Sequence, residues 1–106
     1  MSDKINVWVK HPGKQPEWVL IWNTLEDMQQ IVGGYIEAVY IAEDMAIICN
    51  EEGLINNLSF NCKVCGHHLF GDLILVGCDE DGFIDCPWDA ESLQNVFPQL
   101  WDGVSA

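Results

Sequence analysis

Residues 35–49 read YIEAVYIAEDMAIIC, which is two apolar stretches separated by an acidic pair. Aromatic and β-branched residues fill the first stretch, and the second is almost continuously apolar. Glu43-Asp44 lies between them, where a tight turn is expected. The pattern predicts a β-hairpin with strands over 35–41 and 45–49. Cys49 closes the second strand, and we expect it to be a buried small hydrophobe rather than a metal ligand.

Before this hairpin, the pattern predicts a further hairpin and a helix. Alternating residues at 5–9 and the apolar run 18–22 flank a turn region that contains Pro12, Gly13 and Pro16. A helix follows, because Asn23 or Thr24 can cap it and Asp27 lies three residues beyond Thr24. Gly33-Gly34 is expected to end this helix.

After residue 49, a polar connector leads to a compact cysteine–histidine loop at 62–68. Strands are expected at 73–78 and 83–86, with a turn between them, and a short helix is expected over 90–100, limited by Pro98. The order predicts one α+β domain over residues 1–106. We expect a small, mostly antiparallel sheet with one or two helices on one face and a zinc-knuckle loop.

The charge balance is strongly acidic. The chain has 106 residues, with 17 carboxylates against 4 lysines and a net charge of −13. Such a chain lacks the basic footprint that direct nucleic-acid binding needs, and anionic membranes repel it. It is attracted to basic surfaces. No signal peptide or apolar run of membrane-spanning length is visible, so we expect a cytoplasmic location, where thiols stay reduced.

Four of the five cysteines are expected to bind one structural zinc ion, at about residues 62–86. Cys62 and Cys65 form a C-x-x-C-G knuckle. A three-residue turn at 80–82 would place Asp79 opposite Phe83 and would bring the second pair of cysteines to one face of the ribbon. The favoured ligands are Cys62, Cys65, Cys78 and Cys86, with His68 and then His67 in reserve.

Enzymatic activity is not expected. A four-cysteine site is closed to substrate, and the chain has neither the deaminase signature nor H-E-x-x-H. No serine–histidine–acid arrangement or phosphate-binding glycine loop is present. Alternatives for the cysteines are a redox pair or reduced core residues. Calcium binding at the acidic turn is disfavoured, because Gly82 comes too early for an EF-hand loop.

The tryptophans divide into two groups. Trp8, Trp18 and Trp22 lie in strand patterns and are expected to pack in the hairpin and core. Trp88 and Trp101 lie in the acidic C-terminal segment, where they could be exposed anchors for a protein partner. We therefore expect a partner surface composed of Asp79, Glu80, Asp81, Asp85, Asp89, Glu91 and Trp88.

Three segments, Asn23–Ile41, Ala46–Gly53 and Leu75–Gly77, resemble a domain-of-unknown-function family of Firmicutes phages, prophages and conjugative elements. The resemblance covers most of the chain and implies an α+β fold and a mobile-element setting. The knuckle at 62–68 departs from the usual pattern, so the resemblance does not imply the zinc. The family's biochemical role is undefined, so it offers no catalytic residues.

Small acidic proteins of this setting resemble inhibitors of host defence. The resemblance and the charge together imply an anti-CRISPR protein in the host cytoplasm, which binds the type II RNA-guided nuclease and prevents target DNA from loading. Three alternatives stay open: a sponge for a nucleotide immune signal, a zinc-stabilised protein-interaction module, and an intracellular zinc enzyme, which an open coordination site would support. The sponge is disfavoured by the absence of arginine, because phosphates are bound by arginine, lysine or helix N-termini.

Overall fold

The computed structural model describes residues 3–102. Its centre is a six-stranded sheet in the order β2-β1-β7-β4-β3, with β8 paired to β7. Every strand pairing in this range is antiparallel, which confirms the predicted α+β fold with a mostly antiparallel sheet. The strands of the sheet are β1 (Lys4–Lys10), β2 (Glu17–Trp22), β3 (Ile36–Ala42), β4 (Met45–Asn50), β7 (Leu73–Asp79) and β8 (Gly82–Ile84).

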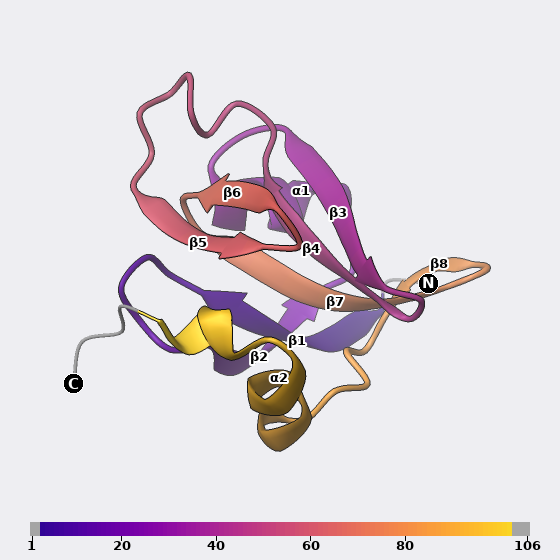
Figure 1. Cartoon of the computed structure of the whole chain (residues 1–106). Coiled ribbons are helices and arrows are strands. Elements are labelled where there is room, and N and C mark those ends of the chain that lie inside the picture. Colours follow the sequence, from indigo (N-terminus) through magenta and orange to yellow (C-terminus); the bar gives the residue numbers. More distant parts are fainter. Residues whose placement is uncertain (1–2, 103–106) are drawn as a thin grey trace.

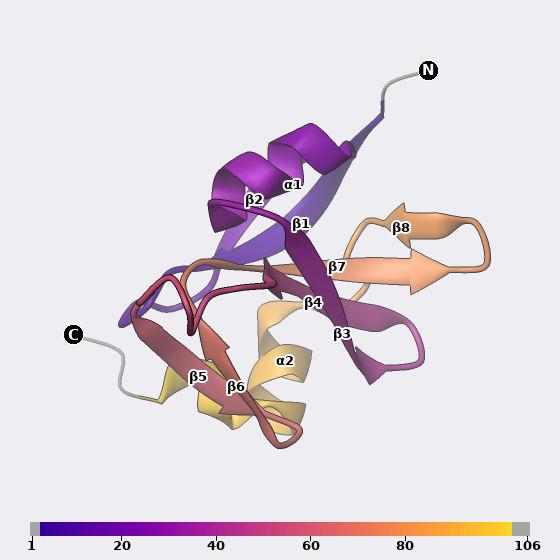
Figure 2. The ribbon, with the colours of Figure 1, turned by 90° about the horizontal axis from the view of Figure 1, so that it is seen from above.

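The two α-helices lie on opposite faces of this sheet, as Figure 2 shows. On one face is α1 (Leu25–Val32), and on the other are α2 (Ala90–Val96) and the 3-10 helix η1 (Pro98–Trp101). The two-stranded sheet of β5 (Phe60–Val64) and β6 (His67–Phe70) shares the face of α2 (Figure 1). The prediction that the helices share one face is therefore wrong. It failed because β4 and β7 are apolar on both sides and need cover on both.

Two core clusters correspond to the two faces. Met28 and Val32 of α1 belong to one cluster, together with Ile48 of β4. Leu93 of α2 belongs to the other, together with Ile47 of β4. Successive residues of β4 thus alternate between the clusters, which is the period of a strand buried on both sides.

The capping signals of α1 are confirmed. Thr24 accepts a hydrogen bond from the Asp27 amide at 3.1 Å, and Gly33 adopts the left-handed conformation at φ 82°. The Asp27 carboxylate does not complete a capping box, because it accepts from the Trp22 amide instead. No helix within residues 3–102 is long and apolar enough to cross a membrane.

The C-terminal elements are shorter than predicted. The strand expected at 83–86 ends at Ile84, because the chain turns away from β7 and the Cys86 amide donates to the Asn6 carbonyl of β1. The helix expected over 90–100 ends at Val96, and η1 follows it. Pro98 explains the break, since it has no N–H to continue an α-helix.

Candidate functional site

The C-x-x-C segment forms a β-hairpin turn rather than a knuckle. Val64 pairs with His67, so Cys65 and Gly66 are the two central turn residues, at φ 49° and 82°. Positive φ at both positions is typical of a type I′ turn. The Cys62 side chain is buried in the core, whereas Cys65 is exposed at the tip. The two sulfurs are therefore not held toward one point.

The second cysteine pair is separated by the sheet. Asp79 pairs with Gly82 and Cys78 pairs with Phe83, so the turn has two residues instead of the predicted three. Cys78 packs against the cluster on the α1 side, and Cys86 belongs to the cluster on the α2 side. The prediction that Cys78 and Cys86 share one face of the ribbon is wrong, because both the register and the path after Ile84 differ from it.

The reserve ligands lie elsewhere. His67 and His68 are exposed on β6 and line a cavity of about 350 Å³, whose wall also includes Glu37 and Cys49. Sequence reasoning missed this proximity, because β6 and β4 are far apart along the chain and no spacing connects them. The Cys49 thiol there donates to the Glu37 carbonyl oxygen at 3.6 Å.

The buried thiols are held in their neutral form. Burial raises the pKa of Cys62 to about 11, although the nearby Lys10 ammonium acts in the opposite direction. Burial also raises the pKa of Cys86. Thiol–disulfide exchange needs a thiolate, so these environments do not favour it.

Within residues 3–102, no group of three or more histidine, cysteine, aspartate or glutamate side chains is placed to hold a metal ion. The four predicted ligands do not fit zinc in this arrangement, since one is exposed at a turn and another is across the sheet from its partner. The zinc ion stays a prediction made from the cysteine spacing.

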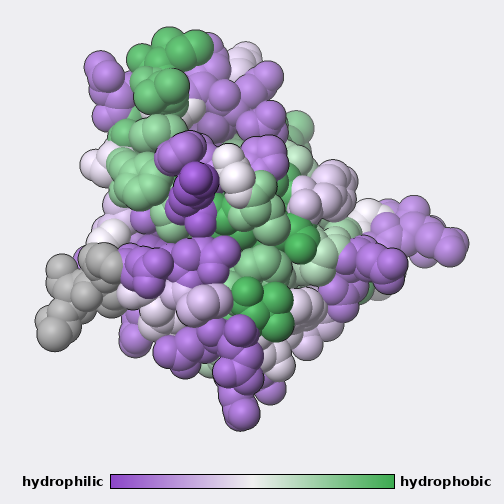
Figure 3. Space-filling view, in the orientation of Figure 1, coloured by the Kyte–Doolittle hydropathy of each residue, from purple (hydrophilic) through white to green (hydrophobic). Residues whose placement is uncertain are grey.

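The acidic segment, residues 79–91, directs its carboxylates outward. All six predicted carboxylates, those of Asp79, Glu80, Asp81, Asp85, Asp89 and Glu91, belong to exposed residues. The β7–β8 hairpin carries three of them on a projection from the body, visible as the hydrophilic protrusion in Figure 3. No lysine occurs between residues 64 and 106, so no basic residue of this segment offsets the charge.

Three of these six carboxylates also have local structural roles. The Asp79 side chain accepts from the Asp81 amide at 2.8 Å, and that of Asp85 accepts from the Asn6 amide at 2.7 Å. Asp89 caps α2 by accepting from the Ser92 amide, which lowers the pKa of Asp89. Charge can therefore be removed at Glu80, Asp81 and Glu91 without losing one of these hydrogen bonds.

The tryptophans are distributed differently from the prediction. Trp88 is half-buried, packs against Phe97 and donates its indole N–H to Asp44, so it is not a free anchor. Trp101 also packs against the core. Trp18 and Trp22, which were expected to be packed, are instead 49% and 46% exposed.

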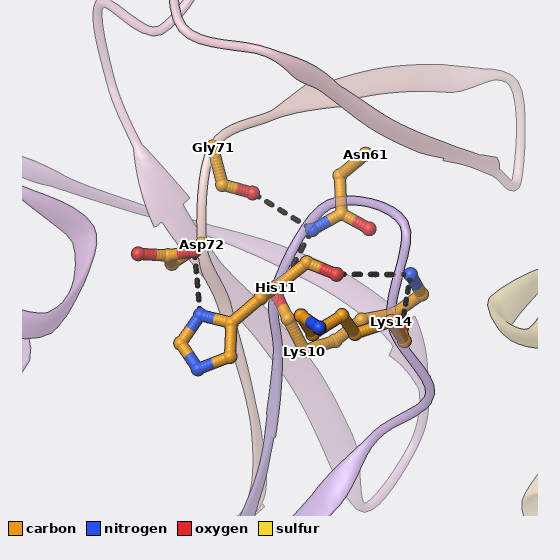
Figure 4. Close-up of polar contacts among 6 residues, drawn as sticks. All are labelled: Lys10, His11, Lys14, Asn61, Gly71 and Asp72. Carbon is orange, nitrogen blue, oxygen red and sulfur yellow. Dashed lines mark hydrogen bonds and ion pairs between the residues drawn. The ribbon is translucent and has the colours of Figure 1, made fainter. Parts of the chain in front are cut away.

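A buried lysine and a buried asparagine lie where the end of β1 meets β5, and the asparagine makes the link between them (Figure 4). Lys10 is fully buried, and its ammonium donates to the Lys14 carbonyl at 2.9 Å, while burial lowers the pKa of Lys10. The Asn61 amide donates to the carbonyls of Lys10 and Gly71. Beside them, the Nδ1 atom of His11 lies 2.7 Å from the Asp72 carboxylate. One of the four cations is thus withdrawn from the surface.

Comparison with known proteins identifies one family. A family model described as a domain of unknown function, DUF3846, matches residues 5–98. The match includes both helices and all eight strands except the first residue of β1. No curated protein and no solved structure matches the chain.

Proposed function

Because the chain belongs to the DUF3846 family, whose function is unknown, we propose its role from its charge, its surface and the resemblance described above. We propose that it is a phage-encoded anti-CRISPR protein. In this proposal it binds the type II RNA-guided nuclease in the bacterial cytoplasm and prevents target DNA from loading. The observation that carries the proposal is the exposed acidic segment, whose β7–β8 hairpin projects from the body.

The electrostatics favour a basic protein surface as partner. The net charge is −13, and one of the few cations, Lys10, is buried. A nuclease of this kind keeps its heteroduplex in a positively charged channel. An acidic body is steered toward such a channel and is repelled by DNA.

The proposed mechanism is competition for that channel. Carboxylates of the β7–β8 hairpin and of the following segment would occupy cationic positions that otherwise contact phosphate. Because Asp85 and Asp89 are fixed by hydrogen bonds from main-chain amides, part of this charge is held in place before binding. Such preorganisation lowers the entropic cost of association.

An order-of-addition experiment tests this mechanism. The chain is added to nuclease carrying guide RNA either before or after target DNA, and DNA cleavage is measured. We expect strong inhibition in the first order and at least tenfold weaker inhibition in the second. Equal inhibition in both orders contradicts competition, and an absence of binding to the nuclease contradicts the proposed function altogether.

The nucleotide sponge is less well supported. Phosphates are recognised by arginine, lysine or helix N-termini, and the chain has no arginine. Calorimetric titration with cyclic nucleotides is expected to show no binding heat. A protein-interaction module without specificity for a CRISPR nuclease is the broader alternative. In that case the acidic surface would bind a different basic partner.

A further inference from the structure

The strand β2 forms an open edge of the sheet. It pairs with β1 on one side and ends the strand order on the other. On β1, the Asn6 amide donates to Asp85 and the Asn6 carbonyl accepts from Cys86, so both groups point away from β2. Leu20, which is opposite Asn6, is therefore in a non-hydrogen-bonded pair and directs its own N–H and C=O outward.

By the two-residue period, Trp18 and Trp22 direct their main-chain groups outward as well. The Trp22 end is closed, because its amide donates to the Asp27 carboxylate and its carbonyl accepts from the Thr24 amide. The groups of Trp18 and Leu20 have no strand partner within residues 3–102. The open edge is thus short and limited at one end.

The side chains on this edge are apolar and exposed. Trp18, Leu20 and Trp22 share one face of β2, and Leu20 is 55% exposed. Next to them, the ring centres of Trp8 and Trp18 lie 4.9 Å apart. Both rings line a groove of about 480 Å³. The far wall of this groove includes Trp88 and Asp89.

Between Trp18 and Leu20, several of the usual protections of an edge strand are missing. Natural edges carry lysine, proline or a bulge that prevents pairing with another chain. The opposite edge, β3, has an irregularity between Tyr40 and Ala42 and a carboxylate at Glu37. In contrast, β2 is six residues long, with no internal charge and no irregularity in its pairing with β1.

We propose that the outer edge of β2 receives an extended basic segment of a partner protein as an added strand. Main-chain hydrogen bonds form with Trp18 and Leu20, and apolar side chains of the segment lie against Trp18 and in the adjoining groove. The inference goes beyond the proposed function, because it concerns a surface other than the β7–β8 hairpin and does not require the partner to be a nuclease.

The negative charge near β2 favours a basic segment as the added strand. Exposed carboxylates lie on the strand itself, at Glu17, and on the groove beside Trp18, at Asp89. The Lys4 ammonium lies 4.6 Å from the centre of the Trp22 ring, so a cation of the chain already occupies the Trp22 end and the basic segment is expected beside Trp18. A second copy of the chain would bring another net charge of −13 and is disfavoured by repulsion.

The test uses a synthetic peptide of about eight residues, which alternates arginine with valine or leucine and is capped at both ends. A second peptide has the same sequence with alternate amides N-methylated, so that it cannot pair along that edge. We expect the first peptide to bind and to slow hydrogen exchange at the Trp18 and Leu20 amides at least tenfold. We expect the N-methylated peptide to bind at least tenfold more weakly.

A pair of variants locates the contact. Leu20→Pro removes the outward N–H without removing a bond to β1, and edge strands accept proline at such a position. It is expected to weaken peptide binding at least tenfold, whereas Leu20→Ala, which keeps the N–H, is expected to weaken it only about threefold. The N-methyl comparison uses the unmodified chain, so the test does not depend on the folding of Leu20→Pro.

Several results would overturn the proposal: no peptide binding, equal affinity for both peptides, or protection at the β7–β8 hairpin alone. Sedimentation of the free chain as a dimer with protected Trp18 and Leu20 amides would also overturn it, since the occupant would then be a second copy. The assay contains no nuclease, so its failure is distinguishable from failure of the proposed function.

Discussion

Gly77 lies in the central strand β7, where a glycine is usually a poor choice because it adds no side chain to the core. Here, a Cβ atom at this position would run into the main chain of Asp85 and the side chain of Ile84. The glycine thus allows the acidic segment to cross close to the sheet.

We expect Gly77→Ala to lower the free energy of unfolding by about 3 kcal/mol, because backbone must move to admit the methyl group. Urea denaturation measures the loss. Gly13→Ala is the matched control: its φ is +76° but nothing lies within 4 Å, so a loss of about 1 kcal/mol is expected there. Equal losses in the two variants would contradict the close crossing.

A substitution at Cys65 distinguishes the described arrangement of the cysteines from a zinc site. Its thiol is exposed at the tip of the β5–β6 hairpin, so Cys65→Ser is expected to change the free energy of unfolding by less than about 0.5 kcal/mol. If Cys65 were a zinc ligand, the same variant would lose stoichiometric zinc and several kcal/mol of stability. Elemental analysis and urea denaturation of both proteins distinguish these outcomes.

The raised pKa of the Cys49 thiol predicts a loss of stability in alkaline solution. Burial and, secondarily, the Glu37 carboxylate raise the pKa of its thiol from 9.0 to about 11. Between these values the unfolded chain loses the proton while the folded chain keeps it, so the free energy of unfolding falls as pH rises. The contribution lost is at most roughly 3 kcal/mol.

Urea titrations from pH 8 to 10.5 measure this slope, and Cys49→Ala should show a shallower decline than the unmodified chain. The difference between the two curves isolates Cys49, because every other titrating group contributes equally to both. Lys10 is one of them: burial lowers its pKa, so its contribution to stability has the opposite dependence on pH. Parallel curves would show that the Cys49 thiol does not titrate in this way.

At the scale of elements, the strands and helix ends that neighbouring residues determine were predictable. The strands around Glu43-Asp44 follow from apolar runs on both sides of a turn, and the caps of α1 follow from Thr24 and Gly33. The exposure of the acidic segment also followed from its composition. In each case the determining residues are close together in the chain.

The cysteine arrangement was not predictable, because it depends on choices that the local sequence leaves open. The segment from Cys78 to Phe83 suits a turn of either two or three residues, and the difference reverses which side chains share a face. The C-x-x-C-G spacing suits a knuckle and a type I′ hairpin equally well. The distant contact between Cys86 and Asn6 then fixes the path, and no local signal indicates it.

The β7–β8 hairpin is the element that should control association with a basic partner. We expect Glu80→Gln with Asp81→Asn to slow association with the guide-loaded nuclease about threefold to tenfold and to change dissociation less, because exposed charges act mainly by steering. Surface plasmon resonance measures both rates.

The matched control is Glu51→Gln with Glu52→Gln, which removes the same charge from two exposed positions in the connector after β4. If both double variants slow association equally, the net charge rather than the hairpin determines the rate. If neither does, the β7–β8 hairpin does not face the partner.

At the scale of the whole molecule, charge and core are separated. The central strands β4 and β7 are buried by α1 on one face and by the β5–β6 hairpin, α2 and η1 on the other. Almost all of the carboxylates are consequently outside, on a body with a radius of gyration of 12.8 Å. That radius is close to the screening length at 0.1 M salt, about 10 Å, so such a body acts on a distant partner as one negative charge distribution.

This distribution predicts how salt changes binding. Between 0.1 and 0.5 M salt the screening length falls to well below the size of the body, so long-range steering is lost while short-range contacts persist. We expect the association rate with the guide-loaded nuclease to fall about tenfold over this range and the dissociation rate to rise less than about threefold. The Glu80→Gln with Asp81→Asn variant should show a weaker salt dependence, because part of the steering charge is already removed. Stopped-flow measurements at several salt concentrations test both statements. If salt changes mainly the dissociation rate, the partner is held by buried ion pairs rather than steered, and an interface other than the exposed acidic segment must carry the binding.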